Sequence, residues 1–332
     1  MHQAPVLIVD DEPHNLAALE QILSPKYPLV FARSGKDALS AASRHAPSLI
    51  LLDIEMPTMD GYTVCRQLKA NPKTEGIPVI FVSHLAEVGD EAAGFDAGAV
   101  DYIVKPVSPR IVLARVHTHL SLVQVSSLEQ SYRDAIHMLG EAGHFNDADT
   151  GAHIWRMADY VGVLAESYGL PHDVCAQLEL AAPMHDTGKI GIPHALLIKP
   201  GKLDASEWAV MKQHCRIGYD ILIKSNAPIF RMAAEIALRH HERWDGSGYP
   251  DGLVGEAIPL SARIVALADV FDALTMKRPY KEPWPLDRVI QTVRDSAGSH
   301  FDPQLVSVFE SALPRILDIK SVWETKEQQT SA

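Results

Sequence analysis

The chain of 332 residues has little cysteine and no long apolar run, and each shortage excludes a class of protein. The three cysteines, Cys65, Cys175 and Cys215, lie far apart without a Cys-x-x-Cys pair, which argues against a disulfide framework or a thiolate zinc site. No stretch approaches the roughly 18 apolar residues of a membrane span, and the acidic pair Asp10 and Asp11 follows a start without a basic leader. We therefore expect a soluble, cytoplasmic protein that does not bind membranes.

Positive charge is also scarce. Thirty Lys and Arg residues stand against 42 Asp and Glu, and the formal net charge of −12 argues against broad attraction to DNA. A phosphate substrate would have to meet positive charge that is placed locally. Histidine, in contrast, is abundant, because most of the sixteen fall between His137 and His300. Imidazole is the commonest nitrogen ligand for metals, so this excess points to a metal site.

The length favours two domains, since a single hydrophobic core rarely grows past roughly 250 to 300 residues. In residues 1–118, short apolar runs alternate with amphipathic segments of helix length. This pattern predicts a doubly wound, flavodoxin-like α/β domain with a five-stranded parallel sheet. The expected strands are 6–9, 29–32, 49–52, 79–82 and 102–104, and the expected helices are 14–23, 36–44, 62–70, 88–97 and 109 onward.

Residues 119–140 are interpreted as one long helix, because apolar positions recur at helical spacings without a proline. This helix is a linker in the simpler interpretation and the stalk of a homodimer in the other. Beyond residue 140 strand signals nearly vanish, and helices interrupted by Gly and Pro predict an all-α domain over 141–320. A polar tail follows at 321–332.

Polar residues follow four of the predicted strands in the first domain. They are Asp10, Asp11, Asp53, Ser83 and Lys105, and they should converge on the carboxyl edge of the sheet. Three clustered carboxylates repel each other unless a hard cation such as Mg²⁺ neutralises them. Asp53 is then left as an acyl-phosphate acceptor, with Lys105 neutralising the phosphoryl charge and the Ser83 hydroxyl turning toward it.

A lone Asp-Asp pair is more often a solvated loop, but five positions in order are more specific. The segments VLIVDDEP, LILLDIEMPTMDGY, VIFVSH and DYIVKPV resemble the receiver domains of response regulators. The resemblance implies phosphorylation by a sensor histidine kinase and places Tyr102 at the aromatic switch position of the family.

The second half carries five histidines and two aspartates in short motifs. They are His153, His185, Asp186, His214, His240, His241 and Asp269. Alone, each helical histidine would more often be an ordinary surface or core residue. Together they exceed what one ion needs, and they suit at least two ions such as Fe, Mn, Ni or Zn, with Asp186 placed to bridge them. Such a pair of ions would activate a hydroxide and clamp the oxygens of a phosphodiester, so no protein nucleophile is needed.

Several residues near these motifs could contact a phosphate substrate. Lys189 follows the His-Asp pair and could neutralise charge that develops on the phosphate, while Arg278 and Lys281 could hold a second phosphate. Tyr249 lies in a glycine-rich loop that permits close approach to a ligand. For any one of these residues alone, a solvated or salt-bridged role would be the better interpretation.

Residues 140–315 resemble the HD-GYP phosphohydrolases through HDTGK, HHERWDGSGYPDGL, IPLSARIVALADVFDALTMKRPYK and SHFDP. The resemblance implies hydrolysis of cyclic di-GMP to pGpG, GMP or both, and partners such as diguanylate cyclases. It assigns His153, His185, Asp186 and Asp269 to one metal ion. It assigns Asp186, His214, His240 and His241 to a second ion. Many members have Glu at the position of Asp149, where it ligates a third ion; the shorter Asp149 favours a centre of two.

Two other functions compete with a cyclic di-GMP phosphodiesterase controlled through Asp53. One keeps the fold and makes the second domain mainly a pGpG hydrolase. The other makes it a catalytically weak module that senses nucleotides or docks proteins through the Tyr249 loop. A complete set of metal-ligating side chains disfavours the module, because a protein that only binds has no use for it.

Overall fold

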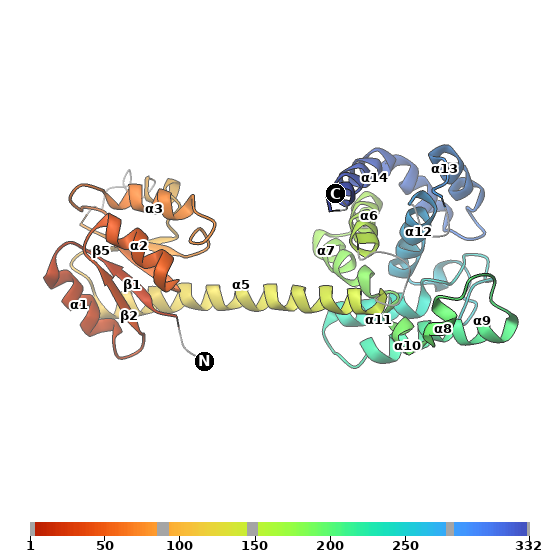
Figure 1. Cartoon of the computed structure of the whole chain (residues 1–332), viewed down its shortest axis with the longest axis horizontal. Coiled ribbons are helices and arrows are strands. Elements are labelled where there is room, and N and C mark those ends of the chain that lie inside the picture. The colour runs from red at the N-terminus through yellow and green to blue at the C-terminus, as the bar shows by residue number, and fades with distance from the viewer. Residues whose placement is uncertain (1–3, 85–92, 145–151, 277–281, 331–332) are drawn as a thin grey trace. The chain divides into compact units, whose positions relative to one another are not determined.

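The computed structural model describes residues 4–84, 93–144, 152–276 and 282–330. Its contacts divide the chain into two units, Met1–Gln130 and Ser131–Ala332. The first unit combines a sheet with helices, and the described part of the second contains no strand longer than an isolated bridge (Figure 1). The α/β and all-α classes predicted for the two halves are thereby confirmed.

Five parallel strands form the sheet of the first unit, in the order β2-β1-β3-β4-β5. They are β1 (Val6–Val9), β2 (Leu29–Ala32), β3 (Leu49–Asp53), β4 (Val79–Ser83) and β5 (Asp101–Val104). The apolar runs of β1, β3 and β4 are buried along their whole length. Such continuous burial is expected for the inner strands of a parallel sheet that helices cover on both faces. Each of the five strands lies at the apolar run that predicted it.

Successive side chains of the strands enter two different cores. Val6 and Ile8 pack with α1 (Pro13–Leu23) and α5 (Pro109–His144), whereas Leu7 and Val9 pack with α2 (Gly35–His45) and α3 (Gly61–Lys69). This alternation follows from the period of two residues in a strand. The first three helices begin and end within one residue of their predicted bounds; of the helix expected at 88–97, residues 93–96 are described and helical.

The long helix predicted at 119–140 lies inside α5, which is continuous from Pro109 to His144. Its first part contributes Val112, Val116 and Leu120 to the core of the first unit, and Ile136 belongs to the core of the second. Between them the apolar side chains of Leu122, Val125 and Leu128 are exposed. No helix of the described residues is both long and apolar enough to cross a membrane.

Short and long helices make up the second unit. They are α6 (Ala152–Tyr168), α7 (His172–Ala181), η1 (Ala182–Met184), η2 (Thr187–Gly191), α8 (His194–Leu197), α9 (Ala205–Met211), α10 (Gln213–Leu222), α11 (Pro228–Arg239), η3 (Gly255–Ala257), α12 (Leu260–Thr275), α13 (Leu286–Asp295) and α14 (Pro303–Thr330). Residues predicted as a polar tail from 321 continue α14, and the indole of Trp323 donates to Asp159 at 2.6 Å. The fold of this unit therefore includes part of that segment.

Candidate metal centre

The polar residues at the strand ends of the first unit meet as predicted. Asp10 and Asp53 are buried, Asp11 is partly exposed, and ligand oxygens of the three lie within 4.8 Å of one another. The ammonium of Lys105 reaches Asp10 Oδ2 at 2.8 Å and Asp53 Oδ2 at 2.9 Å. Ser83 is buried at the end of β4, next to β5 in the sheet. One lysine balances one of three carboxylates, which leaves the cluster suited to a hard divalent cation.

Burial and pairing act in opposite directions on this cluster. Burial raises the pKa of Asp53, although the hydrogen bond and charge of Lys105 lower it. Burial would lower the pKa of Lys105, but its hydrogen bonds to Asp10 and Asp53 outweigh that effect and raise it. Lys105 therefore stays charged while it holds the two aspartates together.

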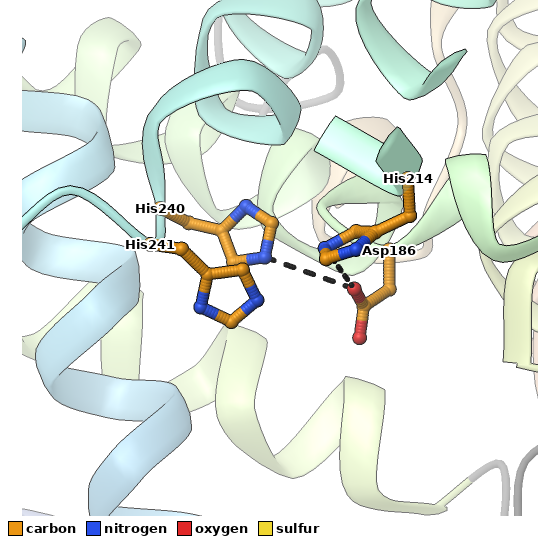
Figure 2. A group of neighbouring side chains, drawn as sticks. All are labelled: Asp186, His214, His240 and His241. Carbon is orange, nitrogen blue, oxygen red and sulfur yellow. Dashed lines mark ion pairs between the residues drawn. The ribbon is translucent and has the colours of Figure 1, made fainter. Parts of the chain in front are cut away.

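The predicted histidines and aspartates of the second unit form two groups. In the first group, ligand atoms of Asp186, His214, His240 and His241 lie within 4.8 Å of one another (Figure 2). In the second, those of His153, His185 and Asp269 do the same. The two groups match the two ligand sets implied by the family resemblance, apart from Asp186, which belongs to the first group and contacts the second.

Short-range features of the sequence bring these side chains together. His185 and Asp186 lie between η1 and η2 rather than on the α-helix expected for them. A Cβ on Gly188 would stand 1.9 Å from the backbone oxygen of His214, so only glycine allows η2 to pack so closely on α10. The glycine of the HDTGK motif thus sets the distance between Asp186 and His214.

Backbone carbonyls fix the orientation of three of the imidazoles. His185 Nδ1 lies 2.9 Å from Ala182 O, and His214 Nδ1 lies 2.7 Å from Met211 O. His240 Nδ1 lies 3.1 Å from Ile236 O. Because a carbonyl only accepts, each Nδ1 carries the proton and donates it. When the ring is neutral, as a metal ligand must be, its lone pair is therefore on Nε2, the nitrogen that faces the cluster.

Asp186 joins the two groups through its two oxygens. Its Oδ1 lies 3.4 Å from His214 Nε2 and 3.7 Å from His240 Nε2, the contacts drawn in Figure 2. Its Oδ2 lies 3.2 Å from His185 Nε2 in the other group. A carboxylate in this position can offer one oxygen to each of two ions.

Buried polar atoms test whether the site suits metal ions. Among the described residues, His240 Nε2 and Asp186 Oδ1 are buried and have no hydrogen-bond partner, an expensive arrangement that an ion would relieve. Burial lowers the pKa of His214 to about 4, so its ring is neutral and can act as a ligand. Burial also works against protonation of His153, but Asp269 and Asp272 raise its pKa to about 10, so a metal would displace a proton there. The residues present fit divalent transition ions.

Cationic and aromatic side chains lie beside the centre. The Lys189 ammonium lies 2.7 Å from Asp186 Oδ2, and its side chain is 20% exposed. The Tyr249 ring lies 4.7 Å from that of His241, between centroids. Lys212, which sequence reasoning passed over, places its ammonium 5.0 Å from the Tyr249 centroid. Lys189, Lys212 and Tyr249 are thus gathered where a phosphate group could approach the ligands.

Three buried charged residues near the site also escaped the sequence analysis. Asp272 contacts His153 Nδ1, and Arg156 forms a two-pronged ion pair with Asp272. Glu242 accepts from the backbone of Asp251 and Leu253 and so holds the loop of Tyr249. Spacing was the available signal, because Arg156 and Asp272 each follow a predicted ligand by three residues on a helix.

Three predicted site residues, Asp149, Arg278 and Lys281, lie outside the described residues. Their predicted contacts with a third ion or with a second phosphate therefore stay predictions. Tyr102 is described and half-buried in β5, where the Arg115 guanidinium lies 5.5 Å from its ring centroid.

Comparison with known proteins identifies both halves. The family model of the response regulator receiver domain matches residues 6–117, and that of the HD domain matches residues 120–305. A "Probable cyclic di-GMP phosphodiesterase" of Vibrio cholerae is 40% identical over 98% of this chain and 82% of its own length. The "Cyclic di-GMP phosphodiesterase response regulator RpfG" of Xanthomonas campestris is 42% identical over 91% and 85% of the two chains. A "3'3'-cGAMP-specific phosphodiesterase 2" of Vibrio cholerae is 45% identical over 54% of this chain and 35% of its own.

Proposed function

The chain belongs to the response regulators that join a receiver domain to an HD domain, and from this we propose that it hydrolyses cyclic di-GMP under the control of phosphorylation at Asp53. The products would be pGpG, GMP or both. The relatives of Vibrio cholerae and Xanthomonas campestris described above, which align over more than 90% of the chain, carry this activity in their names, and they do not favour a module that only binds. The metal-dependent HD domain and its two ligand groups agree with a hydrolase.

The position of Asp186 between the two histidine groups carries this proposal most directly. We assign one ion to His153, His185, Asp186 and Asp269 and a second to Asp186, His214, His240 and His241. When bound, such ions supply the Lewis acidity that makes water a nucleophile at neutral pH. Imidazole and carboxylate ligands without thiolate suit Fe, Mn, Ni or Zn, and a third ion would need Asp149 to reach the centre.

The residues beside the ligands would bind the substrate. Lys189 already pairs with Asp186 Oδ2, so its ammonium stands next to the position of the reacting phosphate and would offset the charge that develops there. The Tyr249 ring would stack on a guanine base, since its contact with the His241 ring holds it in place beside the ligands. Arg278 and Lys281 would hold the second phosphate of the cyclic dinucleotide.

In the receiver, we propose that Asp10, Asp11 and Asp53 bind Mg²⁺ and that a sensor histidine kinase phosphorylates Asp53. The ion pairs of Lys105 support this, because they fix an ammonium beside the acceptor oxygen. Ser83 and Tyr102 would report the phosphoryl group by moving toward it. We divide the chain accordingly into a receiver (1–118), a helical linker (119–140), the HD-GYP domain (141–320) and a tail (321–332).

We also propose that two copies of the chain associate through α5. Its exposed Leu122, Val125 and Leu128 present apolar side chains on successive turns of the helix, a surface that a second copy of the helix would cover. Diguanylate cyclases are a further proposed partner.

A hydrolysis assay tests the proposed activity. The full chain would be incubated separately with cyclic di-GMP, pGpG and 3'3'-cGAMP, and the products separated by chromatography. We expect cyclic di-GMP to be consumed fastest and chelator-treated protein to be inactive until a divalent ion is restored. Faster turnover of pGpG or of 3'3'-cGAMP would instead make that nucleotide the main substrate. No turnover of any of them by the metal-loaded protein would remove the proposed function.

A further inference from the structure

One ligand histidine is oriented differently from its neighbours. Nδ1 of His185, His214 and His240 contacts a backbone carbonyl. Nδ1 of His153 contacts instead the carboxylate of Asp272, 119 residues further along the chain. Its Nε2 faces Asp269 Oδ1 at 3.6 Å, on the side of the metal ligands. Of the two histidine groups, the one with His153 therefore has a charged group behind one of its rings.

Asp272 is itself held by a second charged residue. The Arg156 guanidinium reaches it through two nitrogens, Nε to Oδ1 at 2.5 Å and Nη2 to Oδ2 at 2.8 Å. Asp272 is 1% exposed and Arg156 2% exposed, so water cannot provide these contacts. Such a fork fixes the plane of the carboxylate as well as its charge.

Helix geometry explains how the four residues meet. His153 and Arg156 are three residues apart on α6, and Asp269 and Asp272 are three residues apart on α12, so each pair lies on one face of its helix. His153 contacts both aspartates, one through each ring nitrogen. The ligand pair and its supporting pair thus lie one turn apart along both helices.

We propose that Asp272 is a positioning residue for the metal ion held by His153, His185 and Asp269, and that Arg156 fixes Asp272 in that role. This inference rests on the proposed two-ion function. A carboxylate that accepts the Nδ1 proton sets the tautomer and orientation of a ligand histidine and makes its Nε2 a stronger donor. In the ligand set of the second ion, the described Nδ1 partners of His214 and His240 are backbone carbonyls. Loss of Asp272 should therefore weaken binding of the first ion and not of the second.

The alternative is that Asp272 and Arg156 only join α6 to α12. Asp302 provides a matched control. Like Asp272, it is buried, with 4% exposure, and accepts a hydrogen bond from an arginine, in this case Arg263 of α12 at 2.5 Å. No contact between Asp302 and a predicted metal ligand is found among the described residues. The same substitution at the two positions therefore separates loss of a buried ion pair from loss of support for His153.

The experiment is a calorimetric titration of the metal-free full chain with Mn²⁺, in excess Mg²⁺ so that the receiver aspartates are already filled. It compares wild type with Asp272→Asn and Asp302→Asn, and no substrate is present. We expect wild type to bind two Mn²⁺ ions and Asp272→Asn to bind one of them about 10- to 100-fold more weakly, with the other unchanged. Asp302→Asn should bind both ions as wild type does, whatever its thermal stability.

Unchanged Mn²⁺ affinities in Asp272→Asn, or equal weakening of both ions, would overturn the inference. If Asp272→Asn does not fold, Arg156→Lys replaces it, because lysine keeps the charge but not the fork. This variant should weaken the same single ion by a smaller factor, and wild-type affinities for both ions would count against the proposal. Failure of the two-ion function would appear already in wild type as fewer than two Mn²⁺ ions, whereas failure of this inference appears only in the variants.

Discussion

The two acidic clusters of the chain solve the same electrostatic problem in different ways. In the receiver, three carboxylates share one built-in cation, and Lys105 bonds to two of them. In the second unit, two carboxylates are surrounded by five imidazoles, and among the described residues a lysine pairs with Asp186 but not with Asp269. The first cluster is made of hard oxygen ligands at the edge of a sheet, and the second is made mostly of nitrogen ligands between helices.

The difference indicates which kind of ion each cluster suits. Oxygen ligands bind Mg²⁺ with several waters retained, which suits a site where a phosphoryl group comes and goes. Imidazoles with a bridging carboxylate bind transition ions far more tightly, which suits ions that remain through many turnovers. The receiver cluster therefore suits an ion that exchanges, and the cluster of the helical unit suits ions that stay bound.

Substitution of the bridging carboxylate gives the largest expected effect on this contrast. Asp186→Ala removes an oxygen from each ligand group, so both ions should be lost and hydrolysis of cyclic di-GMP should fall by roughly 10³-fold or more. Metal analysis and an activity assay measure the two effects. Asp220→Ala, an exposed position on α10, serves as the control and should keep both ions and full activity. Full activity of Asp186→Ala with unchanged metal content would rule out the two-ion mechanism.

A phosphoryl mimic bound to Asp53 tests whether the receiver controls the rate of hydrolysis. Beryllofluoride on Asp53 adds the charge of a phosphoryl group, and α5 contains residues of both units. Coupling between two sites in one protein is usually worth a factor of about 5 to 150, so we expect a change of that size in the rate of hydrolysis. Asp53→Asn should not respond to beryllofluoride. An unchanged rate and association state in wild type with the mimic bound would make the receiver a docking domain.

The sequence predicted the five strands and the first three helices of the first unit to within one residue at each end. Its buried strands are continuous apolar runs, and polar residues directly follow them, so local pattern and tertiary position coincide at Asp10, Asp53 and Lys105. The seven ligand candidates of the second unit were also identified in advance, and the structure brings them together in two groups. Both successes depend on motifs in which neighbouring residues share one task.

Residues that act through others were not predictable in this way. Asp272 and Arg156 are 116 positions apart and each looks like an ordinary charged helix residue until α6 and α12 meet. The partner of a buried charge depends on tertiary packing, which periodicity does not report. The turn around His185 and Asp186 was also missed as a turn, because its 3₁₀ geometry depends on the contact of Gly188 with α10.

A smaller effect is expected at the edge of the loaded centre. Lys212 is exposed and its ammonium lies over Tyr249, so it should contribute attraction for the anionic substrate more than to the chemical step. Lys212→Gln should raise KM about 5-fold, because one exposed charge contact contributes roughly 1 kcal/mol to binding. The kcat should stay within about 2-fold of wild type. Lys224→Gln, another exposed lysine, is the matched control. A fall in kcat at constant KM would place Lys212 in the chemistry instead.

The smallest effect concerns acid, which should weaken the histidine-rich unit through a residue outside the ligand set. Burial, with the charge of Arg243, lowers the pKa of His300 to about 4, and its ring is stacked on Phe301. Below about pH 6.5 the imidazole of His300 is protonated in the unfolded chain but not in the folded chain. The free energy of unfolding therefore decreases as the pH falls from about 6.5 toward 4. Between about pH 7.5 and 5 the linkage is worth ~2 kcal/mol, or about 1 kcal/mol after allowance for solvent screening.

All five tryptophans lie beyond residue 150, so urea unfolding followed by tryptophan fluorescence reports the second unit alone. His300→Gln should lose about 1 kcal/mol less than wild type over this range, while titration of the ligand histidines cancels in the comparison. Equal pH dependence in the two proteins would show that His300 does not resist protonation in the folded state.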